Sequence, residues 1–287
     1  MKKIKDIVVT GGAGFVGTNL VKSLSEEGHK ITVIDNLKFG NRLNYIPGVK
    51  YYEANTYEIF ELDIDKPDVI FHLGEYSKVT PSFEEIDLVF DLNIRGSFSV
   101  LEYARKYNIP IVYAGSSTRL ASEGPGHSPY SYFKSCTVDL LKNYNRWYGV
   151  RYNVCYFYNV YGELQDTCNN GWETVISIFE KQYKSNKPLT VVGDGKQRRD
   201  FTYVGDIVNG LIKASLSFKQ EEYQLGSGKD YSILEVARLF SDNITFIKSR
   251  PGDRKKGKAN VEETFTQLNW EPKGKLTDWI SKVKKNT

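Results

Sequence analysis

The chain has few of the residues that build metal sites, disulfide frameworks or membrane spans. Among its 287 residues there are three cysteines, three histidines and one methionine. The odd number and irregular spacing of the cysteines indicate free thiols in a reducing compartment; they are Cys136, Cys155 and Cys168. No apolar run reaches the length of a membrane span, and no signal peptide follows Met1. We therefore expect a cytoplasmic protein with no metal site and no membrane partner.

A strong charge of either sign is also missing. The 39 basic and 35 acidic residues leave a formal charge of +4, and the basic residues are spread along the chain. Without a dense basic run, nucleic acid is not the expected partner. A mildly basic surface suits an anionic small molecule equally well. The hydrophobic content of 40% is enough for one large or two modest cores.

The N-terminal region contains a strand–loop–helix–strand pattern. Residues 7–10 form a short β-branched run, and residues 30–34 form a second one. Between them lies a helix with apolar periodicity that we expect to end near Gly28. The loop that opens this helix has the sequence Gly11-Gly12-Ala13-Gly14-Phe15-Val16-Gly17. The pattern predicts a βαβ unit.

The spacing of Gly11, Gly14 and Gly17 is typical of a loop that binds the pyrophosphate of a dinucleotide. Asp35 follows the second strand, where a carboxylate can bind the ribose 2′-hydroxyl and repel a 2′-phosphate. This favours NAD, although Lys38 and Arg42 leave NADP as a second possibility. A phosphate-binding P-loop is disfavoured because threonine, not lysine, follows Gly17.

The strand–helix alternation continues through the first half. Further strands are expected near 49–53, 68–73, 110–114 and 151–158, with helices over 82–108 and 130–147. Such alternation predicts an α/β fold of the Rossmann type, a doubly wound parallel sheet. We expect a dinucleotide-binding domain at 1–160, rejoined near 201–225, and a smaller substrate-binding domain at 161–287.

A tyrosine and a lysine stand four positions apart at the start of the helix near 130. Because residues i and i+4 share a helix face, Tyr130 and Lys134 can reach the same small volume. A nearby cation favours a phenolate, which can take a proton from a sugar hydroxyl and return it. Ser116 lies at the carboxyl end of the preceding strand, where ligands of open α/β sheets bind.

Several motifs, in order along nearly the whole chain, resemble the extended short-chain dehydrogenase/reductases, in particular the nucleotide-sugar epimerase/dehydratase group. The resemblance rests on segments 10–17, 35–37, 72–73, 93–96, 116–118, 128–134, 158–162, 193–195, 199–204, 250–253 and 268–272. It implies a catalytic triad of Ser116, Tyr130 and Lys134, in which the nicotinamide of NAD accepts the hydride.

The same resemblance implies which residues contact the two ligands. Those assigned to the cofactor are Gly11, Gly14, Phe15, Val16, Gly17, Asp35, Asn36, Asn55, Leu73, Tyr130 and Lys134. Those assigned to a nucleotide-sugar substrate are Ser117, Asn159, Arg199, Arg250 and Asp253. Arginine suits the diphosphate because its planar fork bonds two oxygens at once.

The resemblance also narrows the reaction. Family dehydratases carry an Asp-Glu pair after the catalytic hydroxyl, and related decarboxylases carry a Glu; here the positions hold Ser117 and Thr118. This favours a 4-epimerase acting on UDP-glucose/galactose or the N-acetylated UDP-hexosamines. A dehydratase or reductase of the same family, or a non-catalytic protein that binds NAD and nucleotide sugars, are the alternatives.

Two further expectations concern the substrate and the assembly. In the epimerases that the chain resembles, a bulky residue about four positions past the aspartate that matches Asp253 narrows the sugar pocket; here that position is Gly257, which would leave room for an N-acetyl group. The helices around 88–104 and 140–147 carry apolar residues that the family uses in a homodimer contact. The chain also departs from the family pattern at Arg119, and Glu75 and Tyr76 replace small residues beside the expected nicotinamide site.

Overall fold

The computed structural model describes residues 5–121, 124–165, 173–248 and 256–286. Within these residues, seven parallel strands form the central sheet, in the order β3-β2-β1-β4-β5-β6-β11. Its strands are β1 (Asp6–Thr10), β2 (Lys30–Ile34), β3 (Lys50–Tyr52), β4 (Val69–His72), β5 (Ile111–Ser116), β6 (Tyr152–Phe157) and β11 (Glu222–Leu225). The predicted doubly wound α/β fold is confirmed.

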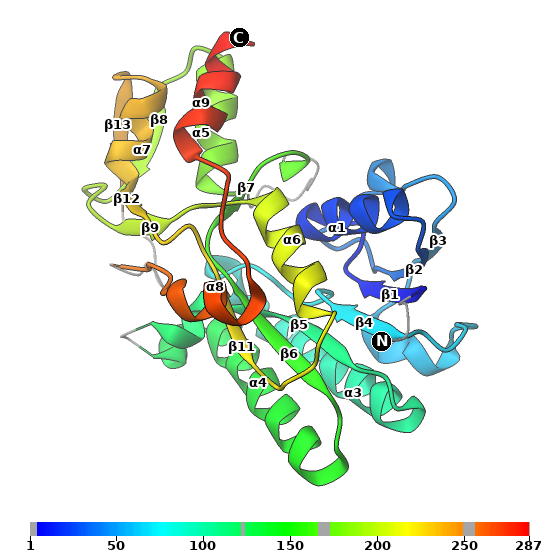
Figure 1. Cartoon of the computed structure of the whole chain (residues 1–287). Helices are drawn as coiled ribbons and strands as arrows, with labels where there is room; N and C mark the ends of the chain where they lie inside the picture. The colour runs from blue at the N-terminus through cyan, green and yellow to red at the C-terminus, as the bar shows by residue number, and fades with distance from the viewer. Residues whose placement is uncertain (1–4, 122–123, 166–172, 249–255, 287) are drawn as a thin grey trace.

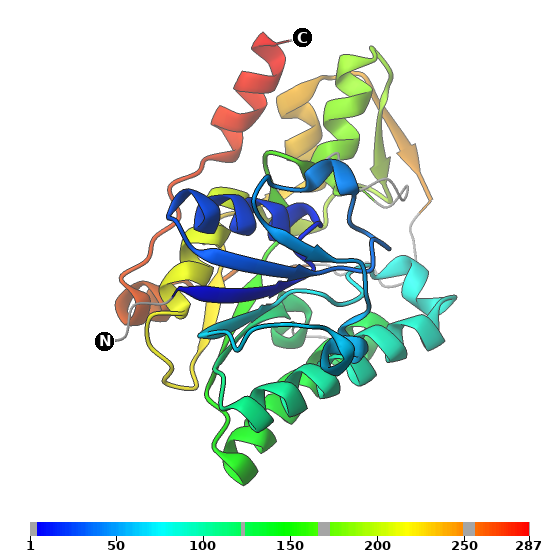
Figure 2. The ribbon, with the colours of Figure 1, turned by 90° about the vertical axis from the view of Figure 1, so that its right-hand side faces the viewer.

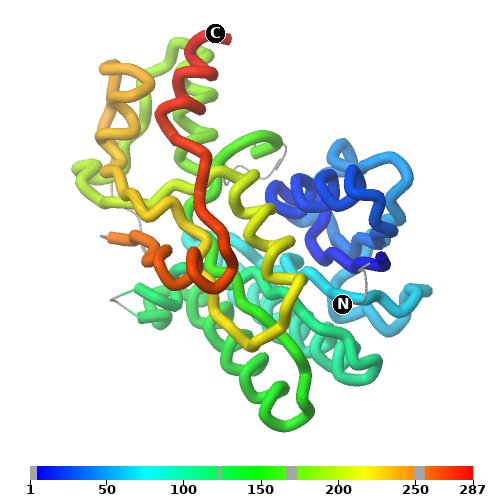
Figure 3. Tube along the Cα trace, viewed as in Figure 1, coloured from blue at the N-terminus to red at the C-terminus, as the bar shows by residue number. Residues whose placement is uncertain are grey.

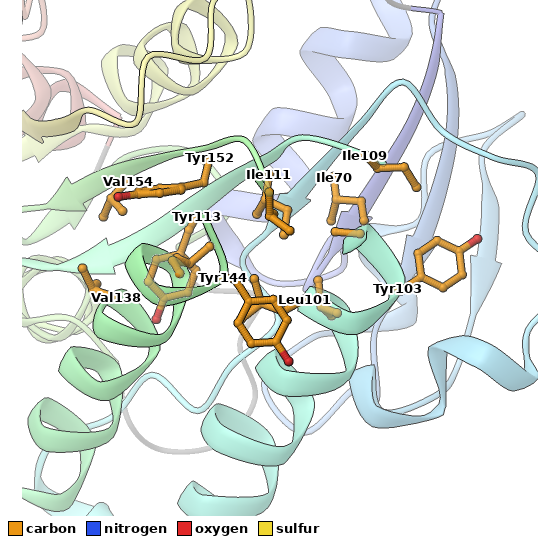
Figure 4. Packing of buried hydrophobic residues seen from close by; sticks show 14 of the residues in the cluster. Ile70, Leu101, Tyr103, Ile109, Ile111, Tyr113, Val138, Tyr144, Tyr152 and Val154 are labelled. Atoms are coloured by element: carbon orange, nitrogen blue, oxygen red, sulfur yellow. The ribbon is translucent and has the colours of Figure 1, made fainter. Parts of the chain in front are cut away.

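Helices cover both faces of the sheet (Figures 1 and 2). One face carries α1 (Phe15–Glu26) and α6 (Val204–Ala214), and the other carries α3 (Gly96–Tyr107) and α4 (Pro129–Tyr148). Figure 4 shows the second face, where tyrosine and aliphatic side chains from β4, β5 and β6 pack against α3 and α4. Because both faces are covered, the central strands β4 and β5 are buried throughout.

Local sequence accounts for the ends of α4. Ser128 caps the helix by accepting a hydrogen bond from the Ser131 N–H, and Pro129 occupies its first turn. Gly149 ends it with φ of 70°, in the left-handed region that favours glycine. The expected helix over 82–108 differs from the structure, which has a 3₁₀ turn (Thr80–Phe83), α2 (Ile86–Phe90), a π-helical turn (Asp91–Arg95) and α3.

A smaller unit lies above the carboxyl edge of the sheet and has its own core. Aromatic and aliphatic side chains from its helices and strands form one buried cluster. Its elements are α5 (Val175–Lys184), β8 (Leu189–Val192), β9 (Arg198–Asp200), β12 (Asp230–Ser232), α7 (Ile233–Phe240), β13 (Ile244–Ile247) and α9 (Leu276–Lys285). β8 pairs with β13 in parallel, and β9 pairs with β12 in antiparallel orientation.

The chain passes repeatedly between the main body and this smaller unit (Figure 3). Short strands β7 (Val160–Tyr161) and β10 (Thr202–Tyr203) pair where it leaves and returns. The segment near 201–225 forms α6 and β11, and β11 is the edge strand beside β6. The helix α8 (Glu262–Leu268) packs on β11 and α6, and Trp270 joins the core beneath α1 and α6. The segment that contains α8 and Trp270 therefore packs on the main body.

Asp200 joins segments that are far apart in sequence. Its carboxylate is fully buried and accepts hydrogen bonds from the backbone N–H groups of Ser227, Gly228 and Ala259, at 2.8–3.1 Å. The Ser227 hydroxyl donates a further bond at 2.6 Å. These bonds hold the loop after β11 and the segment before α8 against the end of β9.

We expect Asp200→Ala to lower the free energy of unfolding by about 3 kcal/mol or more, because several buried donors lose their acceptor. Asp200→Asn keeps one carbonyl acceptor and should cost less. Urea denaturation of the two variants and the wild type measures the difference. Equal stability of Asp200→Ala and the wild type would contradict this role for the carboxylate.

Candidate active site

A pocket lies at the carboxyl ends of β1, β2, β4 and β5, next to the first turns of α1 and α4. This edge is where open parallel sheets bind ligands. Most of the residues that the sequence predicts for the cofactor and the triad line it. They are Gly11, Gly14, Phe15, Val16, Gly17, Asp35, Asn36, Leu73, Ser116, Tyr130 and Lys134.

The glycine loop comes too close to other backbone atoms for any side chain. A Cβ added to Gly17 would lie 2.0 Å from the carbonyl oxygen of Gly11. Gly11 has φ of 71°, and its Cβ would lie 2.8 Å from the backbone nitrogen of Gly74. The first turn of α1 therefore faces the pocket through bare backbone, which fits the pyrophosphate of a dinucleotide.

Asp35 follows β2 and lies against the glycine loop. Its carboxylate accepts hydrogen bonds from the backbone N–H groups of Ala13 and Leu37, at 2.9 and 2.8 Å. Burial raises the pKa of Asp35, and these bonds oppose the increase. The two basic residues that left NADP open are in ion pairs with carboxylates, Lys38 with Glu85 at 3.1 Å and Arg42 with Glu53 at 2.5 Å. The site therefore fits the ribose of NAD better than a 2′-phosphate.

Unlike the other predicted cofactor residues, Asn55 does not line the pocket. Its backbone N–H and side-chain amide both donate to the Glu58 carboxylate, in a capping box that begins a 3₁₀ turn (Thr56–Glu61). The neighbours Ala54 and Thr56 line the pocket instead. Within the described residues, the Thr56 hydroxyl is buried without a hydrogen-bond partner, so a ligand could bind it.

The hydroxyl, phenol and ammonium of the predicted triad border the same pocket. Ser116 ends β5, and its Oγ accepts a hydrogen bond from the Thr118 hydroxyl at 2.9 Å. Tyr130 and Lys134 lie one turn apart at the start of α4. Arg119, a departure from the family pattern, donates to the Asp139 carboxylate at 2.6 Å and to the Ser135 carbonyl at 3.0 Å. It ties the turn after Ser116 to the helix that carries Tyr130.

Lys134 forms a buried ion pair with Glu75, which the sequence identified only as an unusual residue. The Glu75 side chain is completely buried and that of Lys134 is 7% exposed. The ammonium also donates to the Ala114 carbonyl at 2.6 Å. The carboxylate accepts further hydrogen bonds from Ser97 at 2.6 Å and Tyr113 at 2.7 Å. The Thr137 hydroxyl lies 3.3 Å from the same carboxylate and 3.1 Å from the Asn93 carbonyl.

A hydrogen-bond chain leads from the end of β1 to this carboxylate. Thr10 Oγ1 accepts from the backbone N–H groups of Leu73 and Gly74, at 3.1 and 2.9 Å, so its own proton is free for His72 Nδ1 at 2.8 Å. His72 Nε2 then donates to the Ser97 hydroxyl at 2.9 Å, which in turn donates to Glu75. Burial lowers the pKa of His72 to about 4, which agrees with a neutral ring.

The residues predicted to contact the substrate are not gathered at this pocket as the cofactor residues are. Ser117 is buried beside Ser116. Asn159 has φ of 23° and donates to the Asp200 carbonyl at 2.7 Å, and Arg199 lies in β9, where its guanidinium donates to the Arg198 carbonyl at 2.9 Å. The last two predicted residues, Arg250 and Asp253, lie outside the described residues.

Comparison with known proteins agrees with this geometry. A model of the NAD dependent epimerase/dehydratase family matches residues 7–226. A Methanocaldococcus jannaschii protein that carries the provisional name of UDP-glucose 4-epimerase is 33% identical over 96% of both chains. UDP-glucuronic acid decarboxylase 1 of Arabidopsis thaliana is 29% identical over 96% of this chain and 68% of its own. The crystal structure of UDP-glucose 4-epimerase from Thermotoga maritima, with UDP-glucose, superposes with a TM-score of 0.89 at 28% identity, covering 97% of both chains.

A doubly wound sheet with a glycine loop after its first strand and an acid after its second is typical of a dinucleotide-dependent enzyme. The chain belongs to the NAD dependent epimerase/dehydratase family, within the extended short-chain dehydrogenase/reductases. Its cofactor is NAD, which the glycine loop and Asp35 fit. Along the described part of the chain, no helix is both long and apolar enough to cross a bilayer.

Proposed function

We propose that this protein is an NAD-dependent UDP-sugar 4-epimerase that works through a transient 4-keto sugar. The observation that carries the proposal is that Ser116, Tyr130 and Lys134 border one pocket, while the turn after Ser116, with Ser117, Thr118 and Arg119, holds no carboxylate. That set can move one proton on and off a sugar oxygen. It lacks the second acid and base that elimination of water would need.

Each residue of the triad has a distinct task in this mechanism. Tyr130 takes the proton from the sugar 4-hydroxyl, and the Ser116 hydroxyl orients the same oxygen by a hydrogen bond. Lys134 supports the phenolate and binds the cofactor ribose. NAD, held by the glycine loop and Asp35, would supply the reversible acceptance of hydride at C4. Inversion follows when the keto sugar presents its opposite face before the hydride returns and Tyr130 gives the proton back.

The nucleotide-binding parts of the site extend this proposal. The first turn of α1, with Phe15 and Val16, would hold the pyrophosphate, and Asp35 the ribose. Asn36, Asn55 and Leu73 are proposed as further cofactor contacts. The proposed substrate contacts are Ser117, Asn159, Arg199, Arg250 and Asp253.

A dehydratase or decarboxylase of the same family is the main alternative, and the decarboxylase relatives make it concrete. The acids among the described residues that line the pocket argue against it. Asp35 accepts bonds from the glycine loop, and Glu75 is held by Lys134, Tyr113 and Ser97. Neither carboxylate is positioned in the turn after Ser116. A non-catalytic NAD- and nucleotide-sugar-binding protein would show no turnover at all.

Incubation with UDP-glucose or UDP-N-acetylglucosamine should give the C4-inverted sugar. The Tyr130→Phe variant should lower this turnover by about 100-fold or more, because the general base is lost. NAD should remain bound to the variant. Tyr132→Phe, on the exposed side of the same helix, is the matched control and should keep the wild-type rate. A 4-keto or decarboxylated product would instead support the alternative, and a fully active Tyr130→Phe would refute the assigned role.

We also propose that the sugar pocket accepts N-acetylated substrates, because residue 257 is glycine. The Gly257 carbonyl accepts a hydrogen bond from the Asp200 N–H at 2.8 Å, which fixes this segment beside β9. Gly257→Tyr should lower kcat/KM for UDP-N-acetylglucosamine about 10-fold or more relative to UDP-glucose, through steric exclusion of the acetyl group. Gly257→Ala is the control and should accept both. Equal losses for both sugars would contradict the idea.

We propose that the outer sides of α3 and α4 form the contact of a homodimer. Phe98, Trp147 and Tyr148 are each about half exposed there, at 49%, 57% and 55%. Light scattering should give twice the 32.8 kDa mass of one chain, and Trp147→Glu should shift it toward the monomer by placing a charge in the contact. Phe246→Glu, on the distant β13 and equally exposed, should remain dimeric. A monomeric wild type would rule out this contact.

A further inference from the structure

Glu75 is a fully buried acid beside the proposed proton-transfer site, and the mechanism above gives it no task. Its side chain is 0% exposed, and it lies in the loop after β4. The backbone of the next residue, Tyr76, is held by Asn93, whose side-chain oxygen accepts from the Tyr76 N–H at 2.6 Å and whose amide donates to the Tyr76 carbonyl at 3.2 Å. Asn93 belongs to the π-helical turn before α3. Such turns often occur at functional sites.

The Glu75 side chain is surrounded by hydrogen-bond donors from several elements. Lys134 on α4, Tyr113 on β5 and Ser97 on α3 each donate to it. The Thr137 hydroxyl lies 3.3 Å from the same carboxylate but closer to the Asn93 carbonyl, at 3.1 Å. The Tyr113 ring lies between the sheet and α4 in the core shown in Figure 4. The fold therefore holds the Glu75 carboxylate against Lys134.

The partner of this charge is the lysine of the triad. Lys134 directs N–H groups to Glu75 and to the Ala114 carbonyl, and it also lines the pocket. An ammonium has three donors, so one is left to face the pocket. The position of that donor is set by the two bonds behind it, before any ligand binds.

We propose that Glu75 is a positioning residue that anchors Lys134 and offsets most of its charge, so that Lys134 supports the Tyr130 phenolate less strongly than an unpaired ammonium would. This inference rests on the proposed role of Tyr130 as the base. The other charged residues that line the pocket are Asp35 and Lys78. His72, which is linked to Glu75 through the Ser97 hydroxyl, is neutral above a pH of about 4.

The ionisation of Tyr130 can be followed directly by the near-ultraviolet absorbance of its phenolate, with NAD in excess and the spectrum of Tyr130→Phe subtracted at each pH. In Glu75→Gln the uncancelled ammonium should favour the phenolate, and its titration should move to lower pH by about one unit or more. Tyr113→Phe removes one bond to Glu75 without a change in charge. It is the matched control, and its titration should stay with the wild type.

The Glu75→Gln variant leaves Lys134 buried without its carboxylate and can fail to fold for that reason. A double variant tests the proposal in that case. Glu75→Gln/Lys134→Met removes both charges, so its phenolate should titrate close to the wild type. A titration well above the wild type would mean that the lysine charge acts on Tyr130 uncancelled, which would overturn the proposal. So would a Glu75→Gln curve that coincides with the wild type.

These titrations need no sugar substrate, so they separate the two proposals. If no UDP-sugar is inverted at C4 but the single and double variants titrate as expected, the role of Glu75 stands and the epimerase assignment fails. If C4 inversion is found and the titrations do not move, the epimerase assignment stands and the role of Glu75 fails.

Discussion

The close approach of two loops at the carboxyl edge of the sheet is the constraint on which the site depends. β1 and β4 are neighbours, and their ends meet at Thr10 and His72. The Thr10 hydroxyl accepts from the first two backbone N–H groups after His72, so the loop after β4 is bound to the loop after β1. Gly11 and Gly74 have room only for hydrogen at this contact. One junction thus positions both the nucleotide-binding turn and the loop that carries Glu75.

The features predicted from the sequence are those encoded by short, local patterns. The βαβ unit, the ends of α4 and the order of strands up to β6 follow from periodicity, capping residues and glycine. The pocket brings together the glycine loop, Asp35, Ser116, Tyr130 and Lys134 because parallel strands all end at the same edge. No long-range information was needed for these expectations.

The features that sequence reasoning missed depend on contacts between distant residues. Glu75 and Lys134 are 59 positions apart, and no spacing rule connects them. The only signal was that an acid stood where the family has a small residue. Asn55 bonds to Glu58 in the capping box of its own turn, and its neighbour Thr56 lines the pocket instead. This exchange depends on side-chain geometry that the sequence does not reveal. The return of α8 to the main body likewise depends on the burial of Trp270 against a remote core.

The chain of hydrogen bonds from Thr10 to Glu75 has a single polarity. Each hydroxyl and ring nitrogen has its donor or acceptor role fixed by the next, and the two backbone N–H groups at Thr10 fix the first. Reversing the order of the protons would mean breaking backbone contacts between two loops. The interior beneath the pocket therefore contains fixed dipoles, which need no rearrangement while a ligand binds or reacts.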